Sequence, residues 1–276
     1  MTAARNTIEL EIGQIVAGRY GLLRPLGRGG GGSVWLAEDL QRARRMVAFK
    51  CVLPSDHDAR QWTLMTESLE QEFRVLTRLR YPHLTRVFDI GVVENGGRYM
   101  TEEFIDGHTL EELIGRLSAE HTELICAQLL GALDYLDRKS VVHRDIKPGN
   151  IMVRWRLSPH DERHLVPHVK LLDFGLALNQ QLDGPGLQGG THPYMAPERL
   201  LGRDADTISE LYSLAATIYH AVVGHLPHNL ENKDPIALLS LPPVSFDSFP
   251  DEVPRSVCGV LRRPMARALA ACRFSG

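Results

Sequence analysis

The distribution of apolar residues divides the chain into a strand-rich first part and a helix-rich second part. Residues 33–37 and 46–50 each read as a strand, and the basic turn between them predicts a β-hairpin. Residues 68–80 instead carry apolar side chains at helical spacing, at Leu69, Phe73, Leu76 and Leu79. A polar stretch at 54–60 separates this predicted helix from the hairpin. The first hundred residues are therefore expected to form strands and one main helix.

Further along the chain, helical spacing dominates. Residues 110–117 and 123–139 each predict a helix. Two short apolar runs, at 141–142 and 169–172, look like strands, and each stands directly before a polar, charged segment. This order of elements predicts an α+β fold, with a small β-rich part followed by a larger and mainly helical part.

Composition is that of an ordinary globular enzyme. The chain has 276 residues, of which 43% are hydrophobic and 24% charged, enough to bury one large core or two smaller ones. A net charge of -3 argues against nucleic acid or an anionic membrane as a partner. No apolar run reaches the ~18 residues that a membrane span needs, and no signal segment is visible, so a cytoplasmic location is expected. The cysteines lack metal-ligand spacing and are expected to be reduced thiols: Cys51, Cys126, Cys258 and Cys272.

The densest concentration of candidate chemistry follows the two short apolar runs. Residues 143–150 read His-Arg-Asp-Ile-Lys-Pro-Gly-Asn, and residues 173–175 read Asp-Phe-Gly. A carboxylate such as Asp145 can orient the proton of an attacking hydroxyl, while Asn150 and Asp173 offer the hard oxygen ligands that Mg²⁺ prefers. Together these side chains suit phosphoryl transfer.

A glycine-rich segment near the N-terminus supports the same chemistry. Gly27, Gly29, Gly32 and Val34 fit the pattern GxGxxGxV, in which backbone amides can approach phosphate oxygens closely. Taken alone, this segment could be a flexible surface loop. The hairpin that follows favours a phosphate-binding role, because it places Lys50 on a strand. A lysine in that position needs a counter-charge, and a glutamate on the predicted helix can supply it, the alternative for each glutamate there being an ordinary solvated side chain.

These segments resemble the protein kinases, and residues 19–27 and 141–150 look most like bacterial Hanks-type serine/threonine kinases. The resemblance spans about residues 18–270. It implies a two-lobed fold, with an N-terminal extension at 1–17, an N-lobe at 18–102, a hinge at 103–107 and a C-lobe at 108–276. The implied cofactors are ATP and Mg²⁺, with Mn²⁺ as an alternative. The implied partners are proteins that carry acceptor Ser or Thr residues.

The resemblance also implies a role for each matching residue. Asp145 would be the catalytic carboxylate, Lys147 would neutralise charge on the transferred group, and the pair Lys50–Glu72 would hold the nucleotide phosphates. Asn150 and Asp173 would bind the metal ion. The residues implied in ATP binding are Gly27, Gly29, Gly32, Val34, Ala48, Lys50, Glu103, Ile105, Asn150 and Asp173.

Residues 190–198 resemble the segment that shapes the peptide-binding surface of protein kinases. Thr191 would lie beside the substrate and, with Lys147, implies specificity for Ser and Thr. His143 and Phe174 would pack the core of the site. Glu198 would pair with a late arginine, for which the candidates are Arg262, Arg263, Arg267 and Arg273.

Four features depart from the family pattern. Glu102 occupies the usually apolar gatekeeper position at the back of the nucleotide pocket. Glu210 stands where an Asp normally anchors the catalytic loop, which predicts reduced rigidity with retained activity. The segment 154–168, between the catalytic loop and Asp173, is longer than usual. It could form a solvated β-hairpin or a docking surface. Residues 176–190 contain no Ser, Thr or Tyr, so Arg144 has no loop phosphate to bind, and Asp183 is a possible fixed partner.

Two alternatives to a protein kinase remain. A pseudokinase would act as a nucleotide-binding scaffold or regulatory module, and Glu102 and Glu210 are the features that favour it. A small-molecule kinase shares the Asp, Asn and Asp chemistry but normally lacks the segment at 190–198. The chain could also be a fragment of a protein with further C-terminal domains.

Overall fold

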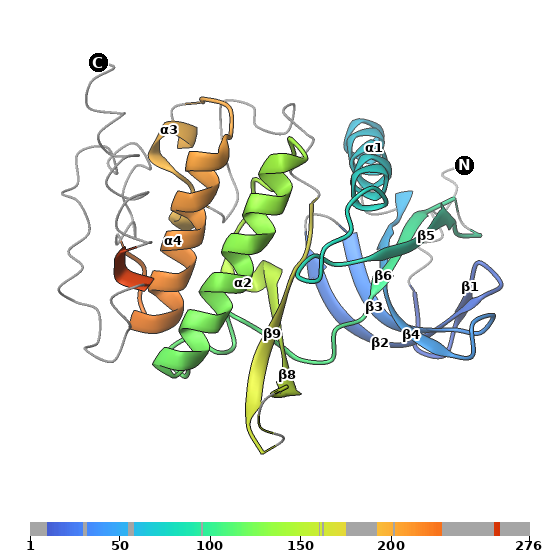
Figure 1. Cartoon of the computed structure of the whole chain (residues 1–276). Helices are drawn as coiled ribbons and strands as arrows, with labels where there is room; N and C mark the ends of the chain where they lie inside the picture. The colour runs from blue at the N-terminus through green and yellow to red at the C-terminus, as the bar shows by residue number, and fades with distance from the viewer. Residues whose placement is uncertain are drawn as a thin grey trace. The chain divides into compact units, whose positions relative to one another are not determined.

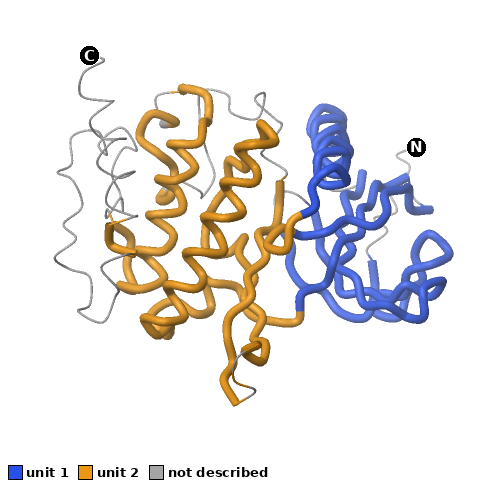
Figure 2. The backbone as a smooth tube through the Cα atoms, viewed as in Figure 1, with its two compact units in different colours: residues 1–80, 85–105 blue, residues 81–84, 106–276 orange. Residues whose placement is uncertain are grey.

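The computed structural model describes residues 10–29, 32–54, 58–94, 96–159, 161, 163–174, 192–200, 202–227 and 257–259 (Figure 1). Contacts between Cα atoms divide the chain into two compact units. The first unit comprises residues 1–80 and 85–105, and the second comprises residues 81–84 and 106–276 (Figure 2). None of the described helices combines the length and the apolar character that crossing a membrane requires.

A six-stranded antiparallel sheet forms most of the first unit. Its strands are β1 (Ile15–Val16), β2 (Tyr20–Gly29), β3 (Gly32–Asp39), β4 (Arg45–Val52), β5 (Val87–Val92) and β6 (Arg98–Glu103). They lie in the order β1-β2-β3-β4-β6-β5. The hairpin expected at residues 33–50 is confirmed as β3 and β4, which pair from Ser33↔Cys51 to Asp39↔Arg45. One face of the sheet packs the aromatic rings of Tyr20, Phe49 and Tyr99 into a buried core.

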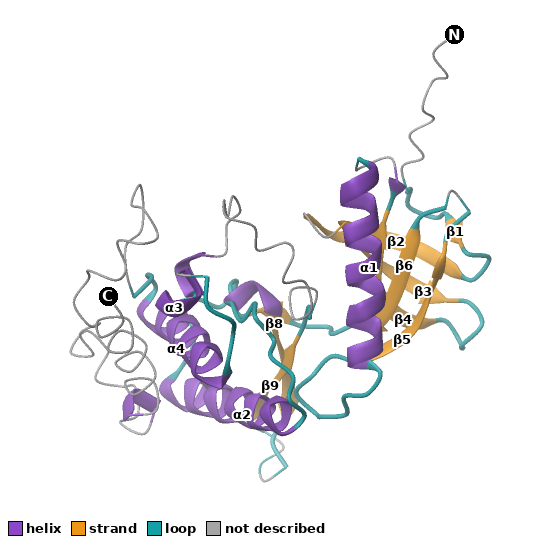
Figure 3. Cartoon of the chain, turned by 90° about the horizontal axis from the view of Figure 1, so that it is seen from above, coloured by secondary structure: helices purple, strands orange, loops and turns teal. Residues whose placement is uncertain are grey.

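Helix α1 (Ala59–Leu76) covers the sheet near β4, β5 and β6 (Figure 3). The expected bounds of 68–80 were wrong at both ends. The helix begins early because Asp58 and Gln61 form a reciprocal capping box that satisfies the first free amides. It ends early because the amides of Arg78 and Leu79 bond three residues back, which tightens the chain into a turn. The apolar Leu79 continued the pattern of the helix without belonging to it.

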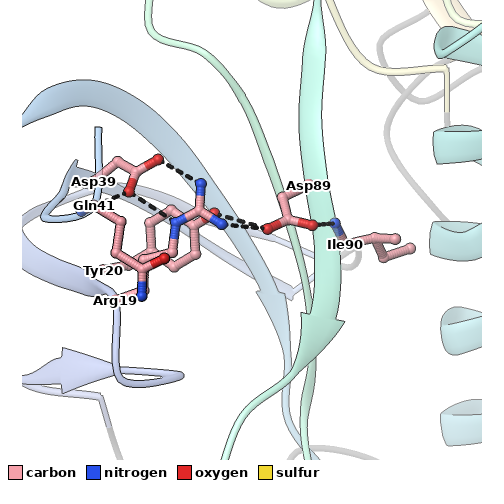
Figure 4. Close-up of polar contacts among 6 residues, drawn as sticks. All are labelled: Arg19, Tyr20, Asp39, Gln41, Asp89 and Ile90. Carbon is pink, nitrogen blue, oxygen red and sulfur yellow. Dashed lines mark hydrogen bonds and ion pairs between the residues drawn. The ribbon is translucent and has the colours of Figure 1, made fainter. Parts of the chain in front are cut away.

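An ion-pair network fastens three strands of this sheet (Figure 4). The guanidinium of Arg19, just before β2, donates to both carboxylate oxygens of Asp39 at 2.8 and 2.6 Å and to Asp89 of β5 at 2.7 Å. The Tyr20 hydroxyl also contacts the Asp89 carboxylate, at 3.2 Å. The side chains of Arg19 and Asp39 are only 17% and 4% exposed. The Arg19 guanidinium holds the pKa of Asp39 below its usual value.

The second unit combines a small sheet with helices. Strands β7 (His108–Thr109), β8 (Ile151–Leu157) and β9 (Leu165–Leu171) pair in that order. Helix α2 (Ala119–Arg138) packs on β9 and on α4 (Thr207–Val223). The two helices lie side by side in Figure 1. Shorter elements are the 3-10 turns η2 (Pro148–Asn150) and η3 (His192–Tyr194) and the helix α3 (Pro197–Leu200).

Two expected elements of this unit were wrong. Residues 110–117 form turns and no helix, because four of their amides bond three residues back and Gly115 adopts a left-handed φ of 69° that ends the run. Val141 and Val142 belong to no strand. The second helix was expected at 123–139, and α2 begins one turn earlier because Ser118 caps its N-terminus.

The hairpin interpretation of residues 154–168 is confirmed for the part that the structure describes. Strands β8 and β9 pair from Ile151↔Leu171 to Leu157↔Leu165. The side chain of Gln128 on α2 closes the outer edge of β9, since its Nε2 donates to the carbonyl of Pro167 at 2.8 Å and its Oε1 accepts from the amide of Val169 at 2.9 Å. One helix residue thus supplies the two hydrogen bonds that a neighbouring strand would have made.

The described cysteines agree with the expectation of free thiols. Cys51 and Cys126 are buried and Cys258 is partly exposed, and none forms a disulfide with another described residue. Burial raises the pKa of the Cys126 thiol to about 11, so it is an unreactive core residue. Cys272 lies outside the described residues.

Candidate active site

The first unit brings together the expected lysine and glutamate. Lys50 lies on β4 and Glu72 on α1, and the Nζ of the lysine lies 2.8 Å from the Oε2 of the glutamate. The two side chains are 11% and 2% exposed. Because each charge would be costly to bury alone, the pair holds the ammonium group in a fixed position on the sheet.

Strand register places several predicted nucleotide-binding residues on the same face of the sheet as Lys50. Directly opposite residues of an antiparallel pair share a face, and every second residue along a strand does so too. Val34 lies opposite Lys50, and Ala48 lies opposite Glu102. Val34, Ala48, Lys50 and Glu102 therefore share one face.

The glycine-rich segment forms the turn between β2 and β3. Gly27 lies opposite Val34, and Gly29 lies opposite Gly32. Gly32 has a φ of 105°, and a Cβ there would collide with the carbonyl oxygen of Cys51. Only glycine fits at this position, which explains that residue locally. Gly30 and Gly31 lie outside the described residues.

The residues expected to contact adenine lie at the end of β6. The Glu103 amide donates to the carbonyl of Arg86 at 2.7 Å, and Ile105 is 7% exposed. The unusual Glu102 accepts a hydrogen bond from the hydroxyl of Thr85 at 3.4 Å. The adenine-binding roles of Glu103 and Ile105 stay predictions.

The catalytic carboxylate expected at Asp145 lies in a compact polar cluster of the second unit. Its Oδ2 accepts from the Nζ of Lys147 and from the Nδ2 of Asn150, both at 2.8 Å. The same Nδ2 donates to the backbone carbonyl of Asp145 at 2.9 Å. Its Oδ1 is buried and has no hydrogen-bond partner within the described part of the chain. One carboxylate oxygen is thus held in place while the other remains an unused acceptor.

The β8–β9 hairpin positions the two expected metal ligands at one end of its strands. Asn150 directly precedes β8, and its carbonyl accepts from the amide of Leu172 at 2.8 Å, one residue before Asp173. Asp173 has a left-handed φ of 59°, an uncommon conformation for a residue with a side chain. The amide nitrogen of Asn150 is committed to Asp145, so its Oδ1 is the atom that can serve as a ligand.

Aromatic packing joins the two motifs. Phe174 and His143 are both fully buried, and their ring centroids lie 4.4 Å apart. The Nε2 of His143 also lies 2.9 Å from the carbonyl oxygen of Leu172. These contacts fix the backbone that carries Asp173 relative to the backbone that carries Asp145.

Glu210 of α4 holds the catalytic loop from its other side. Its Oε2 accepts from the amide of His143 and its Oε1 from the amide of Arg144, both at 2.8 Å. Burial raises the pKa of Glu210, and the two amide donors act against that shift. Arg144 adopts a left-handed φ of 70°. Both oxygens of the longer side chain therefore reach the backbone that an Asp was expected to anchor.

Several sequence expectations fall on residues that are not described. They are Thr191, Gly175, the proposed partner Asp183 and the late arginines Arg262, Arg263, Arg267 and Arg273. Glu198 is 9% exposed, and burial raises its pKa. Its Oε2 has no hydrogen-bond partner among the residues that the structure describes.

One residue beside the catalytic loop belongs to no sequence motif. Glu111, in the turn after β7, places its Oε2 3.3 Å from the position that a Cβ on Gly149 would occupy. Glu111 and Glu112 look in sequence like two solvated carboxylates, and only the folded chain distinguishes them.

Comparison with known proteins agrees with this geometry. The family described as "Protein kinase domain" matches residues 20–243. The serine/threonine-protein kinase PknD of Mycobacterium tuberculosis is 32% identical over 261 residues, covering 91% of this chain and 37% of that protein. PknA of the same species, also named a serine/threonine-protein kinase, is 35% identical over 228 residues, covering 78% of this chain and 49% of that protein. The chain spans less than half the length of these relatives.

Solved structures give the same result for the fold. The kinase domain of Mycobacterium tuberculosis PknI, crystallised as a double mutant, matches with a TM-score of 0.68 and 27% sequence identity. The match covers 98% of this chain and 95% of that one. With its β-rich first unit, its helical second unit and a family match over most of its length, the chain belongs to the protein kinase family and has the two-lobed kinase fold.

Proposed function

We propose that this chain is a serine/threonine protein kinase domain that transfers the γ-phosphoryl group of ATP to a Ser or Thr hydroxyl of a protein. The observation that carries the proposal is the state of the Asp145 carboxylate. Lys147 and Asn150 hold one of its oxygens, and the other is buried without a partner within the described segments. An acceptor hydroxyl supplies the hydrogen bond that this second oxygen lacks.

Protein kinases use ATP and a divalent metal ion, and the donor set of the second unit suits Mg²⁺. Asn150 and Asp173 provide hard oxygen atoms, the preferred ligands of Mg²⁺ and Mn²⁺. No three His, Cys, Asp or Glu side chains gather into a metal site in the described part of the chain. A site with two protein ligands leaves the remaining positions to phosphate oxygens and water, as nucleotide-bound Mg²⁺ requires. When bound, the ion neutralises charge on the phosphates.

The reaction then depends on positioning. Asp145 orients the acceptor hydroxyl and takes its proton, and Lys147 stabilises negative charge on the transferred group. Glu72 keeps the Lys50 ammonium in place for the nucleotide phosphates. The left-handed backbone at Arg144 and Asp173 is stabilised by Glu210 and by the His143–Phe174 contact, so the loop is organised before substrate binds.

The substrate class follows from Lys147 and from the sequence around Thr191. Protein substrates that carry Ser or Thr acceptors are the proposed partners, and no role for nucleic acid is proposed. Because ATP is a cytoplasmic metabolite, a cytoplasmic location is part of the proposal. The proposal allows for further domains outside this chain, since PknD and PknA are longer than the part that it matches.

The test uses purified protein with Mg²⁺, γ-labelled ATP and a basic protein acceptor, beside the variant Asp145→Asn. Loss of the catalytic carboxylate is expected to lower the rate by roughly 10²- to 10⁴-fold. Asp134→Asn is the matched control, because it removes one carboxylate from an exposed ion pair on α2. Equal labelling by Asp145→Asn and the unchanged protein would overturn the assignment. Nucleotide binding without any transfer would instead support the pseudokinase alternative.

A further inference from the structure

The β8–β9 hairpin carries an apolar face that stays exposed near its tip. Every second residue of a strand shares a face, so Trp155 and Leu157 on β8 lie on the same face as Leu165, which pairs with Leu157. His121 of α2 packs on the ring of Trp155, with the ring centroids 4.8 Å apart. Leu157 and Leu165 lie nearer the tip and are 61% and 50% exposed. This adjacent apolar pair continues the buried face of the hairpin into solvent.

The outer edge of β8 has no neighbouring strand over its second half. The pairing with β7 ends at His108↔Val153. A Cβ on Gly107 would collide with the carbonyl oxygen of Val153, so this carbonyl points to the β7 side. Backbone groups alternate between the two edges of a strand, and the N–H and C=O groups of Trp155 and Leu157 therefore point to that side too. No described strand pairs with β8 there, which leaves a free edge.

The opposite face of the hairpin is basic. Arg154 and Arg156 alternate with the apolar positions of β8, and both are exposed. Their cross-strand neighbours are His168 and Val166, so no carboxylate stands opposite either arginine. Neither forms an ion pair within the part of the chain that the structure describes. A strand added to the free edge would therefore meet apolar side chains on one face and positive charges on the other.

We propose that the free edge of β8 binds an extended segment of a partner protein in which apolar residues alternate with acidic ones. The segment adds a strand beside residues 154–157 and forms main-chain hydrogen bonds with Trp155 and Leu157. Its apolar side chains cover the exposed leucines, and its carboxylates face Arg154 and Arg156. This docking surface goes beyond phosphoryl transfer and uses none of the groups proposed for it.

A second copy of this chain fits the edge less well than an acidic partner. Antiparallel pairing of two β8 edges about a twofold axis sets the same strand against itself, and directly opposite residues share a face. Every such register over this part of β8 places arginines opposite each other, at 154 and 156. Like charges in that position are destabilising. Charge complementarity therefore favours a partner that brings carboxylates.

The experiment measures binding of three labelled octapeptides to the purified chain by fluorescence anisotropy. One peptide alternates valine with glutamate, one alternates valine with lysine, and one carries all its valines before all its glutamates. The variants are Leu157→Pro, Leu157→Ala and the double change Arg154→Glu with Arg156→Glu. The matched charge control is Arg60→Glu with Arg78→Glu, which alters two exposed arginines of the first unit.

We expect the alternating glutamate peptide to bind most tightly to the unchanged chain. The double change at 154 and 156 should weaken this binding by roughly 5- to 30-fold and favour the lysine peptide, because two exposed attractions become repulsions. Leu157→Pro should weaken binding by roughly 3- to 10-fold relative to Leu157→Ala, because only proline removes the outward amide hydrogen. The control at 60 and 78 should bind like the unchanged chain.

Three results would overturn the proposal. The first is equal affinity for all three peptides, or binding that persists in the double change at 154 and 156. The second is no binding of any peptide, which would mean that the arginines only protect the edge from unwanted pairing. The third is a dimer in sedimentation that Leu157→Asp converts to a monomer, which assigns the edge to a second copy. Thermal unfolding shows whether each variant is folded, and the double arginine change decides alone if Leu157→Pro is not.

Discussion

At the scale of single residues, Glu210 controls the geometry of the catalytic loop. It is 5% exposed and accepts the amides of His143 and Arg144, one on each oxygen. Replacement by leucine leaves both amides buried without an acceptor. We expect Glu210→Leu to lower the free energy of unfolding by about 1–3 kcal/mol, measured by denaturant titration. Amide exchange at 143 and 144 should also accelerate.

The strands of the first unit provide the internal control for that experiment. Amides of β3 and β4 should accelerate less than those at 143 and 144, because only the latter lose their hydrogen-bond acceptor. Unchanged protection at His143 and Arg144 would show that another group holds the loop. An equal increase in exchange at all positions would instead indicate global destabilisation without a local effect on the loop.

Single residues also show how far sequence can predict a site. The chemistry of Asp145, Asn150 and Asp173 is readable because their order and spacing belong to one short pattern. The contact between Lys50 and Glu72 is also predictable, since a strand lysine requires a counter-charge and the resemblance to protein kinases implies Glu72 as the partner. Glu111 could not be found in this way, because its position near Gly149 brings together segments far apart in sequence and leaves no pattern in either.

At the scale of elements, the Arg19 network should make the first unit sensitive to acid. The arginine lowers the pKa of Asp39, so the stabilisation is fully present above the unfolded value of about 3.9 and is lost as pH falls through the lower folded value. Asp39→Asn should lower the free energy of unfolding by about 1–3 kcal/mol at pH 7. The difference from the unchanged protein should shrink below about pH 4. Urea titrations at several pH values measure it, and a difference independent of pH would contradict this account.

The edge of β9 gives a second prediction at this scale. Gln128→Leu keeps an apolar contact but removes both hydrogen bonds that the glutamine makes to Pro167 and Val169. We expect the free energy of unfolding to fall by about 1–3 kcal/mol, with faster amide exchange at Val169. Exchange at Leu171 should change little, because its amide bonds to the carbonyl of His83. Unaltered protection at Val169 would show that the glutamine does not hold this edge.

The elements also show where periodicity fails as a guide. The β3–β4 hairpin was predictable because its strands are short, apolar and joined by a polar turn. The start of α1 was not, because a capping box at Asp58 and Gln61 decides it. Residues 110–117 have helical spacing, but a Thr109–Glu112 contact and Gly115 favour successive turns.

At the scale of the whole molecule, the two units are not continuous in sequence. The resemblance to protein kinases implied a hinge at 103–107. The segment 81–84 belongs to the second unit although residues of the first unit surround it in sequence. His83 and Leu84 explain this assignment, since their carbonyls accept from the Leu171 amide and the Lys170 ammonium at 2.9 and 3.1 Å. Such pairing with β9 is a long-range contact, which periodicity within a segment cannot indicate.

Residues of both units are proposed to serve one reaction, so ligand binding should depend on each of them. ATP with Mg²⁺ at about 100 times its Kd should stabilise the protein by about 2.7 kcal/mol, seen as a higher Tm. Asp173→Asn, in the second unit, should remove the part of this shift that requires metal, because it deletes a charged oxygen ligand. Lys50→Met, in the first unit, should reduce the shift with or without metal, because it deletes a phosphate contact. Asp134→Asn should behave like the unchanged protein. A full metal-dependent shift in Asp173→Asn would mean that the ion is held elsewhere, and a full shift in Lys50→Met would mean that the buried Lys50–Glu72 pair only stabilises the sheet.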